Sequence, residues 1–301
     1  MKKIYSIVFI CVWVSSLLTV PVSASSKDDI SKSSFSEMEY IYYLKSASDK
    51  ELLKSGISYS DINEIRSFSL ESAVLERKAL SDESLLGMGY TPAQIEILRA
   101  YDGSEITPDS AIMATSPTLS GSVSYISTPS SYAIRFQYSW SWSSLPFFAR
   151  TDYMAVTWNA IAPSGYSTNA SASNISCRAS YYSTSTGAYK YYSSLSSSAL
   201  DSFNGRKASY SEQVAVEEMS DGTTYVYAKT GLMAMTLTSD GTNQISMIKV
   251  CGAVGHQIIS CSVSVNIGAD GLSISYTPAA SVQTLGKKIY KITSSGTCTS
   301  L

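Results

Sequence analysis

Histidine occurs once in this sequence, as His256 in the run Val254-Gly255-His256-Gln257. Imidazole exchanges a proton near neutral pH, so a Ser-His-Asp or Cys-His nucleophilic site would have to use this residue. The Gly-x-Ser-x-Gly turn that presents a serine nucleophile is missing from the sequence. A lone histidine beside a strand is more often a hydrogen-bonded structural residue, and we interpret His256 in that way.

Two facing carboxyl groups would be enough for a glycoside hydrolase. The region with strand-like alternation holds six candidates, which are Asp152, Asp201, Glu212, Glu217, Glu218 and Asp221. Nothing in their spacing brings two of them together, and Asp221 is followed by the glycine of a tight turn. A hydrolase that uses these carboxylates is therefore the alternative function, and no catalytic residue is assigned.

Tyrosine, with 22 copies, dominates the aromatic content. The pairs Tyr181-Tyr182 and Tyr191-Tyr192 lie in strand-like runs, where successive side chains point to opposite faces. Some of these four rings must therefore be exposed, and all four are our candidate ligand-binding residues. Trp140 and Trp142 share one face of a regular strand, and that face is expected to be the core.

Four cysteines lie beyond the N-terminal segment, at Cys177, Cys251, Cys261 and Cys298. An even number in an exported chain permits two disulfides, with three possible pairings. We favour Cys251 with Cys261, because a short connection joins their strands; buried free thiols are the other interpretation. No Cys-x-x-Cys spacing or histidine cluster occurs, so neither a metal site nor a cofactor is expected.

The polarity of the chain comes from hydroxyl groups rather than from charge. Only 15% of its residues are charged and the net charge is -2. Nucleic-acid binding needs a concentrated basic surface, so no nucleic-acid partner is expected. Thr and Tyr suit a half-buried pleated surface, as in extracellular β-sheets.

The first residues have the order of a secretory signal. Met1-Lys2-Lys3 is basic, an apolar run follows from Ile4, and Val22-Ser23-Ala24 supplies the small residues of a cleavage site. We expect a signal peptide over residues 1–24, cleaved after about Ala24, and a secreted, extracellular protein. No later segment is long and apolar enough to span a membrane.

A helical repeat is expected within residues 25–103. The run that begins Ser48-Asp49 aligns without gaps on the run that begins Ser81-Asp82, and Gly56 aligns with Gly89. Each copy predicts a helical hairpin, in which a serine caps the first helix and the glycine ends it in a left-handed turn. Thr91-Pro92-Ala93-Gln94 predicts a capping box for the last helix. Such hairpins are either a partner-binding module or a packing repeat without a ligand.

Beyond a linker at residues 104–118 the apolar period changes to two. Tyr132–Trp142 is the clearest strand, because every second residue is large and apolar. Several further strands and Asp-Gly turns predict one antiparallel β-sandwich or barrel over residues 119–292, followed by a tail at 293–301. The fold class is α+β, mainly β.

Two segments resemble a group of uncharacterised secreted proteins of Gram-positive bacteria. One is Trp140-Ser-Trp142 with the run from Asp152 to Trp158 and Gly255-His256-Gln257, and the other is the helical Leu-Gly-Tyr-Thr-like segment before Tyr101. The resemblance spans most of the chain beyond the signal and implies no activity.

Together these patterns favour a non-catalytic extracellular binding protein. Its partner would be a cell-surface polymer, a glycan or a protein. The secreted hydrolase is the main alternative. A membrane-active β-protein is a third interpretation, because strands rich in Ser and Thr also cross bilayers in assembled barrels.

Overall fold

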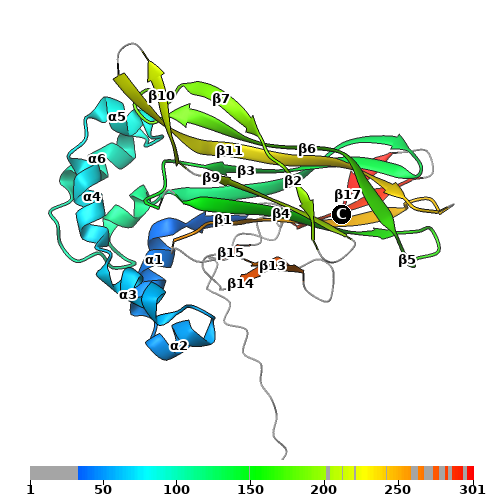
Figure 1. The fold of residues 1–301 in the computed structure, drawn as a ribbon, viewed down its shortest axis with the longest axis horizontal. Coiled ribbons are helices and arrows are strands. Elements are labelled where there is room, and N and C mark those ends of the chain that lie inside the picture. Colours follow the sequence, from blue (N-terminus) through cyan, green and yellow to red (C-terminus); the bar gives the residue numbers. More distant parts are fainter. Residues whose placement is uncertain are drawn as a thin grey trace, which may run out of the picture.

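The computed structural model describes residues 33–301 except 149, 201–203, 212, 220–221, 242, 259–263, 268–273, 278–281, 284–286 and 294–296. The expected signal peptide lies outside the described residues. The described residues include six α-helices and one 3-10 helix, which gather at one end of the molecule (Figure 1). Their bounds are α1 (Glu37–Ser46), α2 (Asp49–Lys54), α3 (Tyr59–Ser67), α4 (Leu70–Lys78), α5 (Asp82–Gly87), α6 (Pro92–Ala100) and η1 (Ala111–Thr115).

The strands form two larger antiparallel sheets and a short two-stranded one. The first sheet has the order β1-β2-β3-β11-β6-β7, with β10 on β11. Its strands are β1 (Ser33–Ser36), β2 (Thr118–Ser130), β3 (Ala133–Trp142), β6 (Ala170–Ser183), β7 (Tyr189–Ser194), β10 (Gln213–Met219) and β11 (Gly222–Ser239).

The second sheet has the order β17-β16-β12-β4-β9-β8, with β5 on β4 and β15 on β12. Its strands are β4 (Thr151–Ile161), β5 (Ser167–Thr168), β8 (Ser198–Ala199), β9 (Gly205–Ser211), β12 (Met247–Gly255), β15 (Val282–Gln283), β16 (Lys287–Ile292) and β17 (Cys298–Ser300). The short sheet pairs β13 (Ser264–Ile267) with β14 (Ile274–Thr277). Because β17 pairs with β16, the second sheet includes residues that the sequence placed in a tail.

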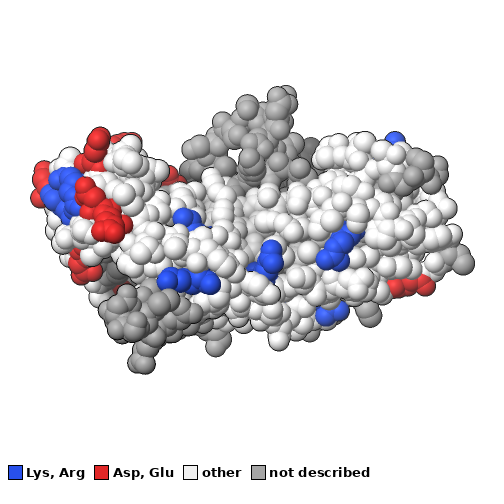
Figure 2. Space-filling model, turned by 90° about the horizontal axis from the view of Figure 1, so that it is seen from above, with Lys and Arg blue, Asp and Glu red and all other residues white. Residues whose placement is uncertain are grey.

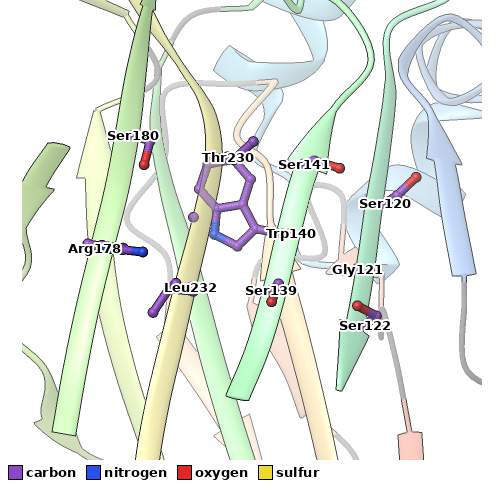
Figure 3. Close-up of a pocket in the computed structure, with 11 residues that line it drawn as sticks. Ser120, Gly121, Ser122, Ser139, Trp140, Ser141, Arg178, Ser180, Thr230 and Leu232 are labelled. Atoms are coloured by element: carbon purple, nitrogen blue, oxygen red, sulfur yellow. The ribbon is translucent and has the colours of Figure 1, made fainter. Parts of the chain in front are cut away.

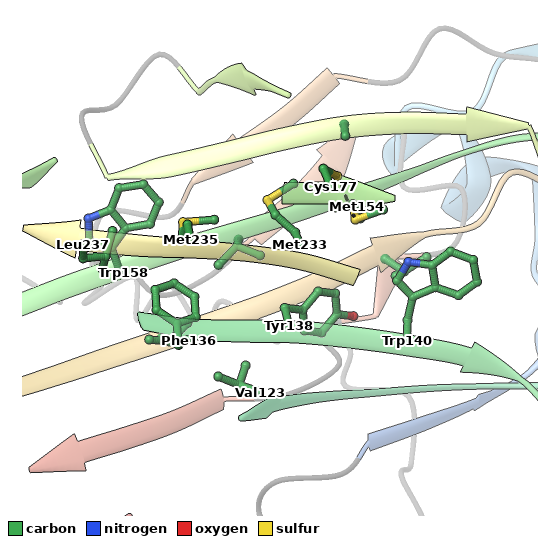
Figure 4. Packing of buried hydrophobic residues seen from close by; sticks show 14 of the residues in the cluster. Val123, Phe136, Tyr138, Trp140, Met154, Trp158, Cys177, Met233, Met235 and Leu237 are labelled. Carbon is green, nitrogen blue, oxygen red and sulfur yellow. Dashed lines mark hydrogen bonds between the residues drawn. The ribbon is translucent and has the colours of Figure 1, made fainter. Parts of the chain in front are cut away.

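The two larger sheets pack face to face as a sandwich. Along β3 the buried positions alternate with half-exposed ones, and the alternation places Phe136, Tyr138, Trp140 and Trp142 in the core, as the sequence predicted for the tryptophans. Figure 4 shows Phe136, Tyr138 and Trp140 of β3 beside Met154 and Trp158 of β4 and the methionines of β11. A Cβ at Gly252 of β12 would lie 2.2 Å from the Tyr138 ring, so the sheets approach closely there. The expected mainly-β class with antiparallel sheets is confirmed, and the arrangement is a sandwich.

The predicted helix caps are confirmed. The Ser48, Ser58 and Thr91 side chains each form a capping box, and the Ser81 side chain caps α5. Gly56 has a φ of 88° and Gly89 a φ of 94°, which are left-handed values that glycine adopts without strain.

The repeat is longer than the sequence alignment suggested. Each unit has three helices and begins at a serine cap, Ser36 for α1 and Ser69 for α4. The two units also share a lysine that donates to a carbonyl at the end of the unit: Lys45 binds Phe68 O, and Lys78 binds Tyr101 O. These shared contacts identify residues 36–68 and 69–101 as two copies of one three-helix unit.

An arginine closes each unit in the same way. Arg66 donates to the carbonyls of Leu44, Lys45 and Ala47 and pairs with Asp49. Arg99 donates to the carbonyls of Lys78 and Leu80 and pairs with Asp82. In both units the planar guanidinium therefore ties the last helix to the end of the first helix and the start of the second.

The helical units are attached to the sandwich by close backbone contacts. β1 leads directly into α1 and pairs with β2, so the chain enters the first sheet before it forms the helices. Leu145 N donates to Met88 O at 2.8 Å. A Cβ at Gly87 would lie 2.5 Å from the carbonyl of Ser185, so α5 rests against the turn after β6. No helix in the described residues is long and apolar enough to cross a membrane.

Candidate functional site

The outward face of the first sheet carries a row of hydroxyl groups that runs across five strands. The strand registers place Ser120 opposite Ser141, Ser141 opposite Thr230, Thr230 opposite Ser180, and Ser180 opposite Tyr192. Neighbouring strands lie about 4.8 Å apart, so the row is roughly 19 Å long. Every member of the row bears a hydroxyl.

A second row lies two residues further along the strands. It contains Ser122, Ser139, Leu232, Arg178 and Ser194, again in direct register from β2 to β7. The residues between the two rows point into the core, since side chains alternate along a strand. The two rows therefore form one surface on the outer side of the sheet.

A hollow of about 530 Å³ lies over these rows (Figure 3). It exists because serine side chains are short and because two residues of its floor, Gly121 and Gly231, have no side chain. The Trp140 ring fills the space below Gly231, where a Cβ would lie 2.5 Å from the ring. Six of the lining residues carry a hydroxyl: Ser120, Ser122, Ser139, Ser141, Ser180 and Thr230.

Most of these hydroxyls are available to a ligand. Within the described part of the chain, the hydroxyls of Ser120, Ser141, Ser180 and Thr230 make no hydrogen bond with another group, whereas Ser139 accepts one from Gln137 at 2.7 Å. A hydroxyl both donates and accepts, so the row offers a mixed set of hydrogen-bonding groups at regular spacing.

Arg178 is the charged residue of the hollow. Its guanidinium lies 5.6 Å from the centre of the Tyr192 ring, within the range of a cation–π interaction. It forms no ion pair with any carboxylate of the described residues. The hollow therefore presents one exposed cation next to an exposed ring.

The four candidate tyrosines divide between the two faces of the sheet. Tyr181 is 3% exposed and stacks on Tyr191 at a centroid distance of 5.1 Å, and Tyr191 packs against the core. Tyr192 is 55% exposed and ends the hydroxyl row. Tyr182 is half-exposed on the outer face. Of the four, Tyr182 and Tyr192 are thus the rings that face outward on the surface that carries the hollow.

Tyr182 belongs to a second aromatic–cation group near the helical end. Lys229 Nζ lies 5.6 Å from the centre of its ring, and Tyr189 meets it edge to face at 5.7 Å. Tyr189 is 51% exposed. The outer face of β6 and β7 therefore carries exposed rings that continue the surface beyond the hollow.

Charge is unevenly divided between the two parts of the chain. Residues 33–110 hold 14 Asp and Glu but only seven Lys and Arg, whereas residues 111–301 hold eight and 11. Figure 2 shows acidic side chains gathered on the helical end and separate Lys and Arg side chains along the sandwich, where most of the visible surface is uncharged. The sandwich region thus carries a small excess of positive charge, in contrast to the acidic helical end.

His256 lies between two carboxylates where the helices meet the sandwich. Its Nδ1 is 2.9 Å from Asp152 Oδ2, and its Nε2 is 3.2 Å from Glu37 Oε1. Glu37 also accepts from the backbone N–H of Phe147 at 2.8 Å and of Phe148 at 3.0 Å. The Gln257 N–H donates to Asp152 at 2.9 Å.

This cluster is sealed from solvent. The side chains of Glu37 and Asp152 are 0% exposed and that of His256 is 1% exposed. Burial alone lowers the pKa of His256, but the charges and hydrogen bonds of Asp152 and Glu37 outweigh it and raise the pKa to about 10. The imidazolium and its two carboxylates form a buried ionic link between α1, β4 and the residue after β12.

The geometry of this link gives it no catalytic use. Both ring nitrogens contact carboxylates, so neither can accept a proton from a nucleophile, and no substrate reaches the group. Because Asp152 binds His256 in this buried cluster, it is not available as a catalytic carboxylate either. Of the other carboxylate candidates, Asp201 and Asp221 lie outside the described residues, as does Glu212, and the side chains of Glu217 and Glu218 are not described.

The structure describes only one of the two cysteines in the predicted disulfide. Cys261 lies outside the described residues, so its disulfide with Cys251 stays a prediction. Cys251 and Cys177 are buried, and burial raises the pKa of the Cys177 thiol to about 12. In the described residues no group of three or more His, Cys, Asp or Glu is arranged to hold a metal ion.

Sequence reasoning did not identify the serine rows or Arg178. The serines looked like ordinary polar positions of alternating strands. Their alternation with buried residues is visible in Ser120–Ser122 and Ser139–Ser141, but their alignment across strands depends on registers that one sequence does not reveal.

Comparison with known proteins does not identify a family. No protein-family model matches the chain, and no curated protein matches it. One similar solved structure is AvmM, which catalyses macrocyclization in alchivemycin A biosynthesis; it has 9% identity, a TM-score of 0.21, and coverage of 55% of this chain and 88% of that one. A pore-forming protein has 9% identity, a TM-score of 0.22, and coverage of 62% and 84%. Neither similarity is strong enough to support a statement about function.

Proposed function

We propose that this protein is a non-catalytic extracellular binding protein, and that the outer face of its first sheet contacts a cell-wall polymer or another glycan. One observation carries the proposal: the unbroken row of hydroxyls from Ser120 to Tyr192 lies under a hollow, and most hydroxyls that line the hollow make no hydrogen bond within the described residues. Export to the cell exterior, as the N-terminal segment suggests, would bring this surface to such polymers.

A polyhydroxylated chain fits the chemistry of the surface. Sugar hydroxyls pair with groups that both donate and accept, which serine and threonine provide. The apolar faces of sugar rings pack against aromatic rings at the surface, which the exposed Tyr192 and the half-exposed Tyr182 provide on the same outer face. A hydroxyl on each successive strand allows a chain that lies across the strands to be contacted along its length.

The alternative hydrolase has less support among the described residues. Asp152 is fully buried against His256, so it cannot face a sugar. The described residues that line the hollow also include no pair of carboxyl groups. Their one charged member is Arg178.

Co-sedimentation of the purified full chain tests the proposal. The insoluble probes are Gram-positive cell-wall sacculi, cellulose and chitin, with liposomes as a separate arm for the membrane-active interpretation. We expect retention on one or more polymers and none on liposomes. Retention on liposomes alone, or on no probe, contradicts the proposal.

Two tyrosine variants locate the contact. The double variant Tyr182→Ala/Tyr192→Ala removes both outward rings, and we expect it to lose at least tenfold in polymer affinity. Tyr166→Ala is the matched control, because Tyr166 is 78% exposed but lies in the turn between β4 and β5 of the other sheet. Equal losses in the two variants would place the binding elsewhere.

A further inference from the structure

The charge of the hollow points to a narrower ligand class than glycans in general. The lining contains six hydroxyl-bearing residues and one cation, Arg178, and it contains no carboxylate. A neutral glycan would form no ion pair with this guanidinium. A polymer that carries an anion at intervals among many hydroxyls would use both kinds of group.

We infer that the hollow binds a phosphate-bearing polyol or glycan chain, with a phosphate against Arg178 and the hydroxylated units along the row from Ser120 to Ser180. This inference rests on the proposed function and specifies its ligand. The two free oxygens of a phosphodiester match the planar fork of a guanidinium, which donates two parallel N–H bonds to such a group.

The position of Arg178 supports a phosphate at this point. Its neighbours in register are Leu232 on one side and Ser194 on the other, so no acidic side chain of the described strands lies opposite the guanidinium and competes for it. The Tyr192 ring lies beside it at 5.6 Å and limits the directions in which the guanidinium can turn. Hydroxyls of Ser180 and Ser139 line the same hollow and can donate further hydrogen bonds to the same two phosphate oxygens.

The surrounding surface favours the same ligand. Lys229 lies near the helical end of the same face, above Tyr182, and adds a second cation beyond the hollow. The acidic side chains gather on the helices rather than over the sandwich (Figure 2). An anionic chain that extends from the hollow along β6 therefore meets positive charge before it reaches the acidic helices.

The inference is tested by comparing binding to the same wall preparation with and without its phosphodiester polymers. Gram-positive sacculi are used intact, with their phosphodiester polymers, and after hydrofluoric acid has removed those polymers. We expect affinity to fall at least tenfold on removal, and soluble poly(glycerol phosphate) to compete for the intact sacculi far better than polygalacturonate, a carboxylate polymer. Equal competition by the two polymers overturns the phosphate assignment.

Variants of Arg178 connect the effect to the hollow. Arg178→Gln should lower affinity for intact sacculi roughly ten- to hundredfold, because a charge-assisted bond is lost, and should weaken the dependence of binding on salt. Arg178→Lys keeps the charge without the fork and should retain part of the affinity. Lys291→Gln is the control. It removes one positive charge from an exposed position on β16 and should change the affinity little.

The outcomes separate this inference from the proposed function. Equal binding to intact and phosphate-free sacculi, with Tyr182→Ala/Tyr192→Ala still impaired, would leave a glycan site and overturn the phosphate class. An unchanged affinity in Arg178→Gln would also overturn it. A chain that binds neither form of the sacculi and no other polymer would overturn both.

Discussion

Glu37 and His256 lie 3.2 Å apart, Oε1 to Nε2, although 219 residues separate them in the sequence. Glu37 is the first residue of α1, and His256 follows β12. Asp152 holds the other ring nitrogen of the histidine. The first helical unit and the second sheet are thus joined at one buried ionic contact, which adds to the backbone contacts that attach the helices to the sandwich.

Neutralising Glu37 should destabilise the fold strongly. Glu37→Gln removes the carboxylate that accepts hydrogen bonds from His256 and from the N–H groups of Phe147 and Phe148, and each lost hydrogen bond to a charged group costs about 1.5–3 kcal/mol. Glu39→Gln is the control, since Glu39 is exposed on the same helix and should change stability by less than about 0.5 kcal/mol. Urea unfolding measures both variants. Similar stabilities for the two would show that the link contributes little.

The charge of His256 predicts a specific pH dependence. Its pKa in the folded protein is about 10, above the ordinary 6.5 of the unfolded chain. Its stabilising contribution is therefore fully present below pH 6.5 and is lost as the pH rises towards about 10. His256→Gln should lack this loss of stability between pH 6.5 and 10.

NMR observes this group without ambiguity, because the chain has one histidine. The ring resonances of the folded protein should be those of an imidazolium at pH 8. A ring that titrates near pH 6.5 would mean that the contacts with Glu37 and Asp152 do not hold the proton.

Replacing Gly87 with alanine should destabilise the protein, although alanine has the higher helix propensity. Replacing glycine by alanine in a helix normally stabilises it by up to about 1 kcal/mol. At Gly87 the added Cβ would lie 2.5 Å from the Ser185 backbone, so we expect a loss of about 1–3 kcal/mol as α5 is pushed from the turn after β6. Gly241→Ala is the control, because the nearest atom to its Cβ would be 4.0 Å away. A stabilised Gly87→Ala variant would show that α5 does not need this close approach.

The features that the sequence predicted well are local. Ser48 and Thr91 cap helices through contacts three residues away, and Gly56 and Gly89 supply a backbone conformation that few other residues adopt. The alternation in β3 likewise places its tryptophans in the core from one strand alone. Such signals require no knowledge of the rest of the fold.

The features that the sequence did not predict join distant segments. The sequence alignment left the first helix out of each repeat unit, because α1 and α4 share few side chains beyond Lys45 and Lys78. His256 was interpreted as structural, and its geometry agrees, but its partners are 104 and 219 residues away. The hydroxyl row likewise depends on four separate strand registers, so no stretch of sequence displays it.

Filling the hollow tests the central claim most directly. Ser141 lies in the middle of the hydroxyl row and points outward, so Ser141→Trp places a large ring in the hollow without entering the core. Ser124→Trp is the matched control. Ser124 lies in β2, on the same outer face of the sheet as Ser141, but it does not line the hollow. Both variants are compared with the unaltered chain in sedimentation with the polymer that retains it, after urea unfolding has shown that they are folded. We predict that Ser141→Trp loses binding at least tenfold while Ser124→Trp keeps it; undiminished binding by a folded Ser141→Trp variant would contradict the assignment of this surface as the ligand site.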